Sequence, residues 1–318
     1  MPYPIDKKLV VAVSSTALFD LSDESQIYLD QGLDAFRSFQ KENRTKPPER
    51  GSAFPFIRRL LHLNKVYETE QPIEVVIISR NHPDAGLRVM DAVKHYELPI
   101  SRSFFLAGSM PYPYMSSVHA SLYLSTDKEE VSEAVDLGFP AGHVLPSKVS
   151  DGDATDTQLR VAFDFDGVIV DDEAELVYQK TNDLELFHDY EVSNRHKPLR
   201  DGPLMPLLKK ISFFQKLERR KATADPTYTQ SLRISIVTAR NAPVHERLLT
   251  TLSNLNIDTD ELFLLGGIER KNVLDVLKPH MFFDDQIGHL EPASVNTPSV
   301  HIPFGKVNQD NKSLDSTS

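Results

Sequence analysis

The sequence predicts an α/β fold built around a parallel sheet. Short apolar segments, bounded by turn residues, alternate with longer segments of helical pattern along the whole chain. The short segments are almost continuously apolar, which is typical of parallel strands that are covered by helices on both faces. The chain has 318 residues, of which 40% are apolar, so it is long enough for two such units of about 150 residues.

Four strands are predicted in each half of the chain. In the first half they are Leu9–Val13, Glu74–Ile78, Ser103–Leu106 and Ser121–Leu124. In the second half they are Leu159–Phe163, Ile234–Val237, Leu262–Leu265 and Met281–Phe283. The segments between them, such as "DAGLRVMDAVKHY" and "PVHERLLTTLSNL", carry apolar residues three and four positions apart. This spacing predicts crossover helices.

The two halves resemble each other. A shift of 150 residues places "VAVSST" on "VAFDFD", and a shift of 160 places "VVIISRN" on "SIVTARN". A shift of 159 places "FFLAG" on "FLLGG" and "LYLSTD" on "MFFDDQ". Any α/β chain repeats apolar strands, but a constant order at a nearly constant shift favours a duplication.

The duplication predicts the domain boundaries. We expect a first α/β domain over 1–146, a polar linker over 147–158, a second domain over 159–305 and a disordered tail over 306–318, because the linker and the tail contain few apolar residues.

Composition excludes several classes of protein. A net charge of −11 argues against broad binding to nucleic acid or to anionic membranes. The absence of cysteine excludes disulfides, thiol catalysis and cysteine metal sites. No apolar run reaches the roughly 18 residues of a membrane span, and "KKLVVAVSSTALF" lacks a small-residue cleavage site, so we interpret it as a buried strand. We therefore expect a cytoplasmic protein with a small-molecule substrate and no nucleic-acid or membrane partner.

Polar side chains follow every predicted strand of the second half. Asp164 and Asp166 follow the first strand, Thr238 ends the second, Lys271 follows the third, and Asp284 and Asp285 end the fourth. Since the carboxyl ends of parallel strands meet at one edge of the sheet, these groups are expected to converge there. Several carboxylates share a small site only with a cation present, and an all-oxygen donor set favours Mg²⁺.

Such a site suits phosphoryl transfer. Asp164 is the candidate nucleophile, which would form an aspartyl-phosphate, and Asp166 is the candidate acid and base. Thr238 and Lys271 would contact the phosphate, although Arg270 precedes Lys271 and leaves the choice of cationic residue open.

The motifs "DFDGV", the threonine of "VTAR", a lysine and "FFDD" resemble, in order, the four motifs of the haloacid dehalogenase-like (HAD) phosphohydrolases. The resemblance implies a Rossmann-like sheet of HAD type. It also implies a metal site formed by Asp164, Asp166 (through its backbone carbonyl) and Asp284, with Asp285 adjacent.

Further segments, "AVSSTALFDL", "QGLDAF", "KPLRDGPL" and "PHMFFDD", resemble the cytosolic 5'-nucleotidase I family up to about Gly305. This resemblance implies Mg²⁺-dependent hydrolysis of nucleoside 5'-monophosphates, AMP among them. Phosphatases of sugar phosphates share the same four motifs and remain an alternative. A nucleotide-binding regulatory protein without turnover is a second alternative, although the intact set of Asp164, Asp166, Lys271 and Asp284 argues against it.

The insert between the first two motifs, at about 171–232, is predicted by the resemblance to the HAD phosphohydrolases to form a helical cap over the site. Candidate substrate contacts are Phe165, Phe187, Lys197, Gly202, Arg240, Asn241 and Asp285. Phe187 has an alternative role in the core of the cap, and Lys197 an alternative as a solvated surface lysine.

The first half lacks the carboxylates of the second. By the shifts above, Ser14 and Thr16 replace Asp164 and Asp166, Ile78 replaces Thr238, and Ser125 and Thr126 replace Asp284 and Asp285. We therefore predict that this half is a degenerate, non-catalytic copy. A structural role in forming a homo-oligomer is the preferred interpretation, and a nucleotide effector site, suggested by the family resemblance, is the alternative.

Overall fold

The computed structural model describes residues 5–148, 155–181 and 183–308. The first half contains η1 (Ile5–Lys7), β1 (Leu9–Val13), α1 (Ser15–Leu18), α2 (Ser22–Glu42), α3 (Phe54–Val66), β2 (Ile73–Ser79), α4 (Pro83–His95), β3 (Arg102–Phe105), α5 (Tyr112–Met115), η2 (Ser116–Val118), β4 (Ala120–Ser125), α6 (Lys128–Asp136) and β5 (Ala141–Val144). The second half contains β6 (Leu159–Phe163), α7 (Glu173–Thr181), α8 (Leu184–Ser193), α9 (Met205–Ala224), β7 (Leu232–Thr238), α10 (His245–Asn254), β8 (Glu261–Leu264), α11 (Arg270–Leu277), β9 (Met281–Asp284), α12 (Ile287–Ser294) and β10 (Ser299–His301).

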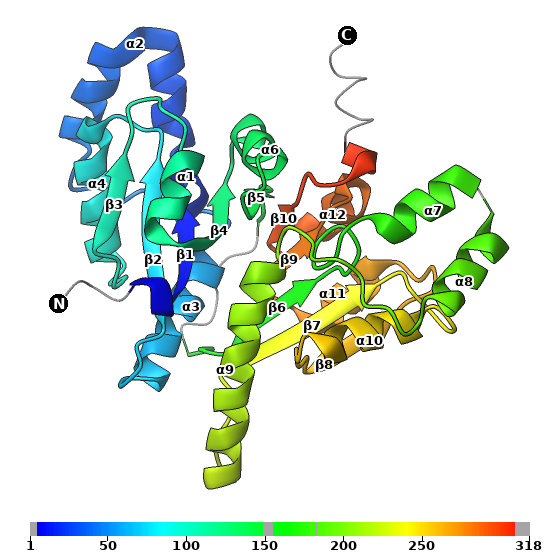
Figure 1. The fold of residues 1–318 in the computed structure, drawn as a ribbon. Coiled ribbons are helices and arrows are strands. Elements are labelled where there is room, and N and C mark those ends of the chain that lie inside the picture. The colour runs from blue at the N-terminus through cyan, green and yellow to red at the C-terminus, as the bar shows by residue number, and fades with distance from the viewer. Residues whose placement is uncertain (1–4, 149–154, 182, 309–318) are drawn as a thin grey trace.

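All ten strands belong to one continuous sheet in the order β3-β2-β1-β4-β5-β10-β9-β6-β7-β8. Neighbouring strands run parallel except β5 and β10, which pair antiparallel through Val300 with Val144 and His301 with His143. The two halves lie side by side along this sheet, and α7 and α8 project beyond the second half (Figure 1). The mostly parallel α/β fold of Rossmann-like type is thereby confirmed.

The eight predicted strands are present with small differences in their bounds, whereas the sequence analysis missed β5 and β10. These two strands are short, with the sequences "AGHV" and "SVH". They are the strands that join the halves, and their pairing depends on a contact between distant parts of the chain.

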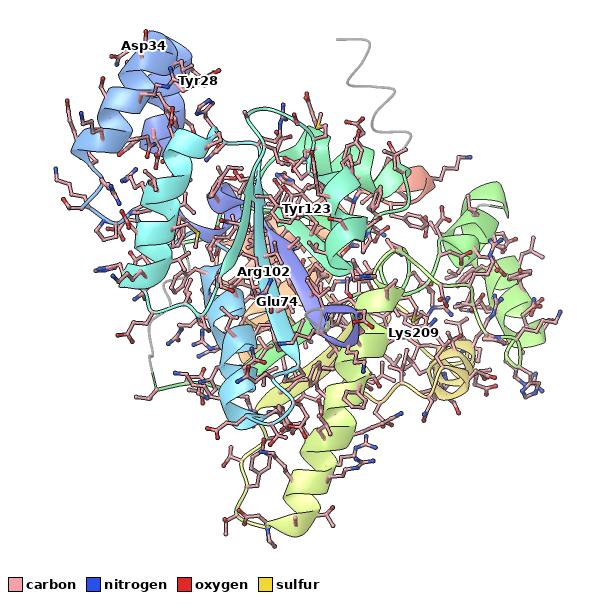
Figure 2. The ribbon with its side chains drawn as sticks, turned by 60° about the vertical axis from the view of Figure 1, so that its left-hand side comes forward. Tyr28, Asp34, Glu74, Arg102, Tyr123 and Lys209 are labelled. Carbon is pink, nitrogen blue, oxygen red and sulfur yellow. The ribbon has the colours of Figure 1, made fainter. Side chains whose placement is uncertain are left out.

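The two halves share the core on one face of the sheet. A single apolar cluster contains Leu9 and Val11 of β1 together with Val161 of β6, and the ring of Phe56 on α3 lies 6.4 Å from the ring of Phe283 on β9. The other face carries two separate clusters, one in each half, and the first of them surrounds the buried Tyr123 (Figure 2). A continuous sheet and a shared core therefore hold the predicted domains together.

Helices α3 and α9 strengthen this junction. The hydroxyl of Tyr67, directly after α3, donates a hydrogen bond to Glu218 on α9. Lys221 of α9 reaches back to the carbonyl of Val66, at 2.6 Å.

The structure repeats its backbone geometry in the two halves. The order β3-β2-β1-β4-β5 recurs as β8-β7-β6-β9-β10, reversed along the sheet. Matching hydrogen bonds close the segment that follows the first strand of each half: the N–H of Gly51 donates to Leu18 O at 2.9 Å, and the N–H of Gly202 donates to Ile169 O at 2.9 Å. A Cβ on Gly51 would lie 2.5 Å from Ala17 O, and one on Gly202 would lie 2.4 Å from Val170 O, so both contacts require glycine.

An ion pair at the outer strands also recurs, with its charges exchanged. Glu74 on β2 pairs with Arg102 on β3 at 2.5 Å, and both lie close together in Figure 2. At the corresponding place in the second half, Arg233 on β7 pairs with Glu261 on β8.

This register corrects one prediction for the first half. Ser79, rather than Ile78, occupies the position of Thr238, since each is the last residue of its strand. The N–H of Asn81 donates to Ser79 Oγ at 3.2 Å, just as the N–H of Arg240 donates to Thr238 Oγ1 at 3.3 Å. The hydroxyl at this position is therefore present in both halves.

The first residues of the predicted tail, 306–308, are ordered against the second half. Asn308 is buried, and its amide donates to Asp285 O at 2.9 Å and to Phe304 O at 2.7 Å. Residues 309–318 of the predicted tail, and 149–154 of the predicted linker, lie outside the described residues. Within the described part of the chain, none of the helices has the length and apolar character needed to cross a membrane.

Candidate active site

The carboxyl ends of β6 and β7 form the floor of a pocket with a volume of ≈ 340 Å³. Asp164, Asp166 and Thr238 line it from the sheet, and Leu184 and Phe187 line it from α8. Asp164 follows β6 directly, and its N–H donates to Phe283 O at 2.8 Å, which extends the pairing with β9. The sheet therefore brings Asp164, Asp166 and Thr238 under the predicted cap.

Arg270 lies against the candidate nucleophile. Its Nη2 donates to Asp164 Oδ2 at 2.7 Å, and its Nε lies 3.2 Å from Asp284 Oδ2. His289 on α12 contacts the same guanidinium, at 2.9 Å from Nη1. Burial raises the pKa of the Asp164 carboxyl well above its ordinary value, and the nearby carboxylates raise it further, while Arg270 opposes both effects.

Lys271, the predicted phosphate contact, does not face the pocket. Its Nζ pairs with Asp275 at 2.9 Å along the surface of α11, and its side chain is 38% exposed. Adjacent residues of an α-helix point about 100° apart, so only one of Arg270 and Lys271 can face the strand ends. The helix presents Arg270, which settles the position of the cationic side chain that the sequence left open.

Asp164, Asp284 and Asp285 form a group of carboxylates that suits a cation. One oxygen from each lies within 4.8 Å of the others. Asp284 Oδ2 and Asp285 Oδ1 are buried and accept no hydrogen bond among the described residues. A Cβ on Gly167, whose φ is +71°, would lie 2.5 Å from Asp285 Oδ2, so glycine keeps this side of the group open. Two carboxylate oxygens that accept no hydrogen bond, beside the carboxylate of Asp164, fit a hard divalent cation.

The side chain of Asp166 is not part of that group and is held by Arg240. Nε and Nη2 of Arg240 donate to the two carboxylate oxygens, both at 2.8 Å. The third nitrogen of Arg240 bonds Glu191, a fully buried residue of α8 that also bonds Arg247 at 2.8 Å. Bidentate pairing fixes the orientation of a carboxylate. The cap thus reaches the candidate acid and base through Glu191 and Arg240.

The other predicted contacts divide into two groups. Phe187, Arg240 and Asn241 line the pocket, whereas Phe165, Lys197 and Gly202 do not. The ring of Phe165 is buried in the shared core, with the guanidinium of Arg240 5.5 Å from its centroid. Lys197 is exposed and offers its backbone carbonyl to Arg247 at 3.0 Å. These placements favour the surface interpretation of Lys197 and a structural role for Gly202.

Sequence reasoning assigned no role at the site to Glu191, Arg247 or His289. Glu191 and Arg247 lie in segments of helical pattern where charged residues are ordinarily exposed, and both are buried here. A buried charge is normally paired, and Glu191 pairs here with both Arg240 and Arg247. No local pattern in the sequence reports that burial.

The chain was compared with known proteins. The family model described as 5'-nucleotidase matches residues 1–309. Cytosolic 5'-nucleotidase 1B of Homo sapiens is 33% identical over 300 residues, which cover 92% of this chain and 48% of that protein. The chain therefore spans about half the length of this curated relative.

Two solved structures show only weak similarity. Histidinol dehydrogenase from Elizabethkingia anophelis is 11% identical with a TM-score of 0.22, covering 89% of this chain and 66% of that chain. MnaA of S. aureus in complex with UDP is 12% identical with a TM-score of 0.21, covering 97% and 88%. Neither similarity bears on the fold or the function.

Proposed function

Because the chain belongs to the 5'-nucleotidase family, we propose that it hydrolyses nucleoside 5'-monophosphates to nucleoside and inorganic phosphate. One observation carries the proposal: Asp164, Asp166, Thr238 and Arg270 converge on one pocket beneath the cap. The relative is named as a cytosolic enzyme, and a cytosolic location is part of the proposal.

The first chemical step is assigned to Asp164. A carboxylate oxygen of Asp164 attacks the phosphorus, and the bond between phosphorus and the 5'-oxygen breaks. The electron pair stays on that oxygen, which takes the proton of the Asp166 carboxyl. The products are the nucleoside and an aspartyl-phosphate at Asp164.

The second step regenerates the enzyme. Asp166, now a carboxylate, removes a proton from a water molecule that attacks the phosphorus. The bond between phosphorus and the Asp164 oxygen breaks, and phosphate leaves. Arg240 keeps the carboxyl group of Asp166 oriented in both its protonated and its ionised form, and Arg270 and Thr238 interact with the phosphate oxygens.

A divalent cation belongs to the proposal, and Mg²⁺ is the first choice because every available donor is oxygen. Asp164, Asp284 and Asp285 would hold it, and the carbonyl of Asp166 is the fourth donor that the family resemblance suggests. When bound, the cation supplies positive charge that balances the clustered carboxylates and the phosphate.

The nucleoside is assigned to the part of the pocket below α8. Phe187 offers a ring for stacking on the base, and Asn241 offers an amide for polar contact. Base and sugar preference would be set by these residues and by the neighbouring His188.

Phosphate release from purified protein tests the proposal. We expect release from AMP and other nucleoside 5'-monophosphates with Mg²⁺, little release after chelation, and little release from glucose 6-phosphate. Faster release from the sugar phosphate would mean that the substrate is a sugar phosphate, hydrolysed by the same two steps. If no nucleoside 5'-monophosphate released phosphate in the presence of Mg²⁺, the proposed activity would be refuted.

A further inference from the structure

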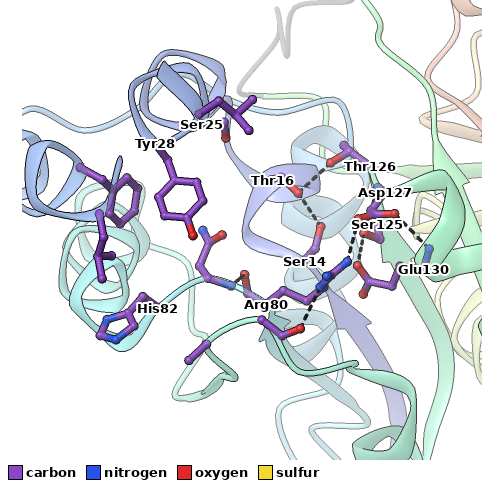
Figure 3. A pocket seen from close by; sticks show the side chains of 17 residues that line it. Ser14, Thr16, Ser25, Tyr28, Arg80, His82, Ser125, Thr126, Asp127 and Glu130 are labelled. Carbon is purple, nitrogen blue, oxygen red and sulfur yellow. Dashed lines mark hydrogen bonds and ion pairs between the residues drawn. The ribbon is translucent and has the colours of Figure 1, made fainter. Parts of the chain in front are cut away.

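A second and larger cavity lies in the first half, at the place that corresponds to the active site. Its volume is ≈ 870 Å³, and it opens at the carboxyl ends of β1, β2 and β4 (Figure 3). Ser14, Ser79 and Ser125 line it where Asp164, Thr238 and Asp284 stand in the second half. A cavity of this size accommodates a small organic molecule.

Hydroxyl groups form the floor of this cavity. Ser14 Oγ lies 3.0 Å from Thr16 Oγ1, and the hydroxyl of Thr126 donates to Thr16 Oγ1 at 2.7 Å. Hydroxyls both donate and accept hydrogen bonds, so they can rearrange to bind a ligand that itself carries hydroxyls. Within the described chain, a cluster of three carboxylates suited to a metal is found only at Asp164, Asp284 and Asp285, and serine and threonine stand at the corresponding places of this floor.

The charged residues of the cavity disfavour a phosphate. Its one arginine, Arg80, is engaged by Asp127 at 3.2 Å and by Gly108 O at 3.3 Å. Asp127 and the buried Glu130 add two carboxyl groups to the same wall. The active site, by contrast, has two arginines in its lining, Arg240 and Arg270. Carboxyl groups and hydroxyls together suit the hydroxyls of a sugar better than an anion.

Helix α2 supplies the opposite wall, which is apolar and aromatic. Gly32, at φ +81° and ψ −174°, interrupts the helix, so residues before and after the bend both line the cavity. The rings of Tyr28 and Phe36 meet edge to face, with 5.8 Å between centroids. Tyr28 points its ring toward the polar floor in Figure 3, and Leu29 beside it is 74% exposed. This wall can cover the face of a flat ring.

We propose that this cavity binds a neutral ring compound bearing hydroxyls, of the nucleoside type, and does not turn it over. The base lies against Tyr28, and the sugar hydroxyls contact Thr16, Thr126 and Asp127. The choice of a nucleoside among such compounds rests on the proposed function, which produces one. The existence of a binding site is inferred from the cavity and its lining alone, so it does not depend on the proposed catalytic activity.

Calorimetric titration of the full chain with adenosine tests the proposal. We expect Tyr28→Ala to weaken adenosine binding at this site by about tenfold, in line with the loss of one stacking contact. Thr126→Val should weaken it as well, because it removes a hydroxyl from the floor. Both variants should release phosphate from AMP at a rate within about twofold of wild type. Melting temperatures verify that each variant is folded.

Three comparisons keep the test decisive. Tyr114→Ala changes a partly exposed tyrosine of the same half outside this cavity, and it should leave adenosine binding unchanged. If Phe187→Ala lost all adenosine binding and Tyr28→Ala lost none of it, the nucleoside would bind in the active site alone. That result would overturn the proposal. Inorganic phosphate or AMP that competes for the Tyr28-dependent site more strongly than adenosine would overturn the assignment of a neutral ligand.

Failure of this proposal and failure of the proposed function give different results. A protein that releases no phosphate can still bind adenosine in a Tyr28-dependent manner, and an active enzyme can lack that binding.

Discussion

The two strand-end pockets have matching backbones and different side chains. Matching hydrogen bonds close the segment that follows the first strand of each half. The second strand of each half ends in a residue with a hydroxyl group, Ser79 in one and Thr238 in the other. At the first and fourth strands, serine and threonine in the first half stand where the second half has aspartates. The sheet therefore provides the same positions in both halves, and a few side chains decide whether a position can support phosphoryl transfer.

The two pockets also differ in the groups that contact their buried carboxyl groups. Asp164 is buried beside Arg270, with unused carboxylate oxygens nearby that suit a cation. Glu130 of the first half is equally buried but receives a hydrogen bond from the Tyr123 hydroxyl. Burial raises the pKa of both carboxyl groups, and this effect is opposed by Arg270 at Asp164 and by the hydrogen bond from the Tyr123 hydroxyl at Glu130.

The largest expected effect comes from the first pair of matched positions. Asp164→Asn should lower kcat for AMP by at least about a thousandfold, because the amide cannot attack phosphorus. Ser14→Asn makes the corresponding change in the first half, where asparagine can still cap α1, and should leave kcat within about twofold. Phosphate-release kinetics on both variants measure the contrast. Equal losses in the two variants would mean that the halves do not differ in the way proposed.

The next effect separates two neighbouring residues of α11. Arg270→Ala should lower kcat/KM by about a hundredfold, because the phosphate loses a charged donor. Lys271→Ala should change it by less than about twofold, since Lys271 pairs with Asp275 on the surface. Steady-state kinetics with AMP test both, and a larger loss in Lys271→Ala would restore the sequence-based choice.

A third effect concerns the buried acid that connects the cap to Asp166. Glu191→Gln leaves Arg240 and Arg247 without their shared anion, which should reduce the free energy of unfolding by about 3 kcal/mol. Asp189→Asn, on the exposed side of the same helix, should change it by less than about 0.5 kcal/mol. Urea titrations measure both values. The kcat of Glu191→Gln should also fall, because Arg240 then holds Asp166 less firmly, and an unchanged kcat would leave Glu191 with a purely structural role.

The smallest effect depends on pH. Burial raises the pKa of Glu130 from 4.5 to about 7. A raised carboxyl pKa means that the folded state holds the proton more tightly, so this contribution to stability is complete below about pH 4.5 and is lost as pH rises through about 7. Glu130→Gln cannot ionise, so its stability relative to wild type should increase by on the order of 2 kcal/mol between pH 5 and pH 8.

The neighbouring Glu129 provides the control for this measurement. It is exposed on the same helix, so Glu129→Gln should show no comparable change with pH in urea titrations. A Glu130→Gln curve parallel to wild type would contradict the shifted pKa.

The strands and the acidic pairs could be predicted because their signals are local. Continuous apolar runs such as "LVVAV" and "LRVAF" report burial directly, and Asp164 and Asp166 follow such a run without a gap. Strands β5 and β10 gave no such signal, since each is three or four residues long and contains a histidine. They are strands because the two halves meet there.

The sequence by itself determined the α/β class, the repeat, and the strand ends at which carboxylates stand. The tertiary structure decided which side chains meet. The orientation of α11 turns Arg270, rather than Lys271, toward Asp164. The strand register makes Ser79 the counterpart of Thr238, and packing of the cap brings Glu191 into contact with Arg240. Hydrophobic periodicity is read along the chain, whereas helix orientation, strand register and long-range pairing depend on packing between segments that the sequence separates.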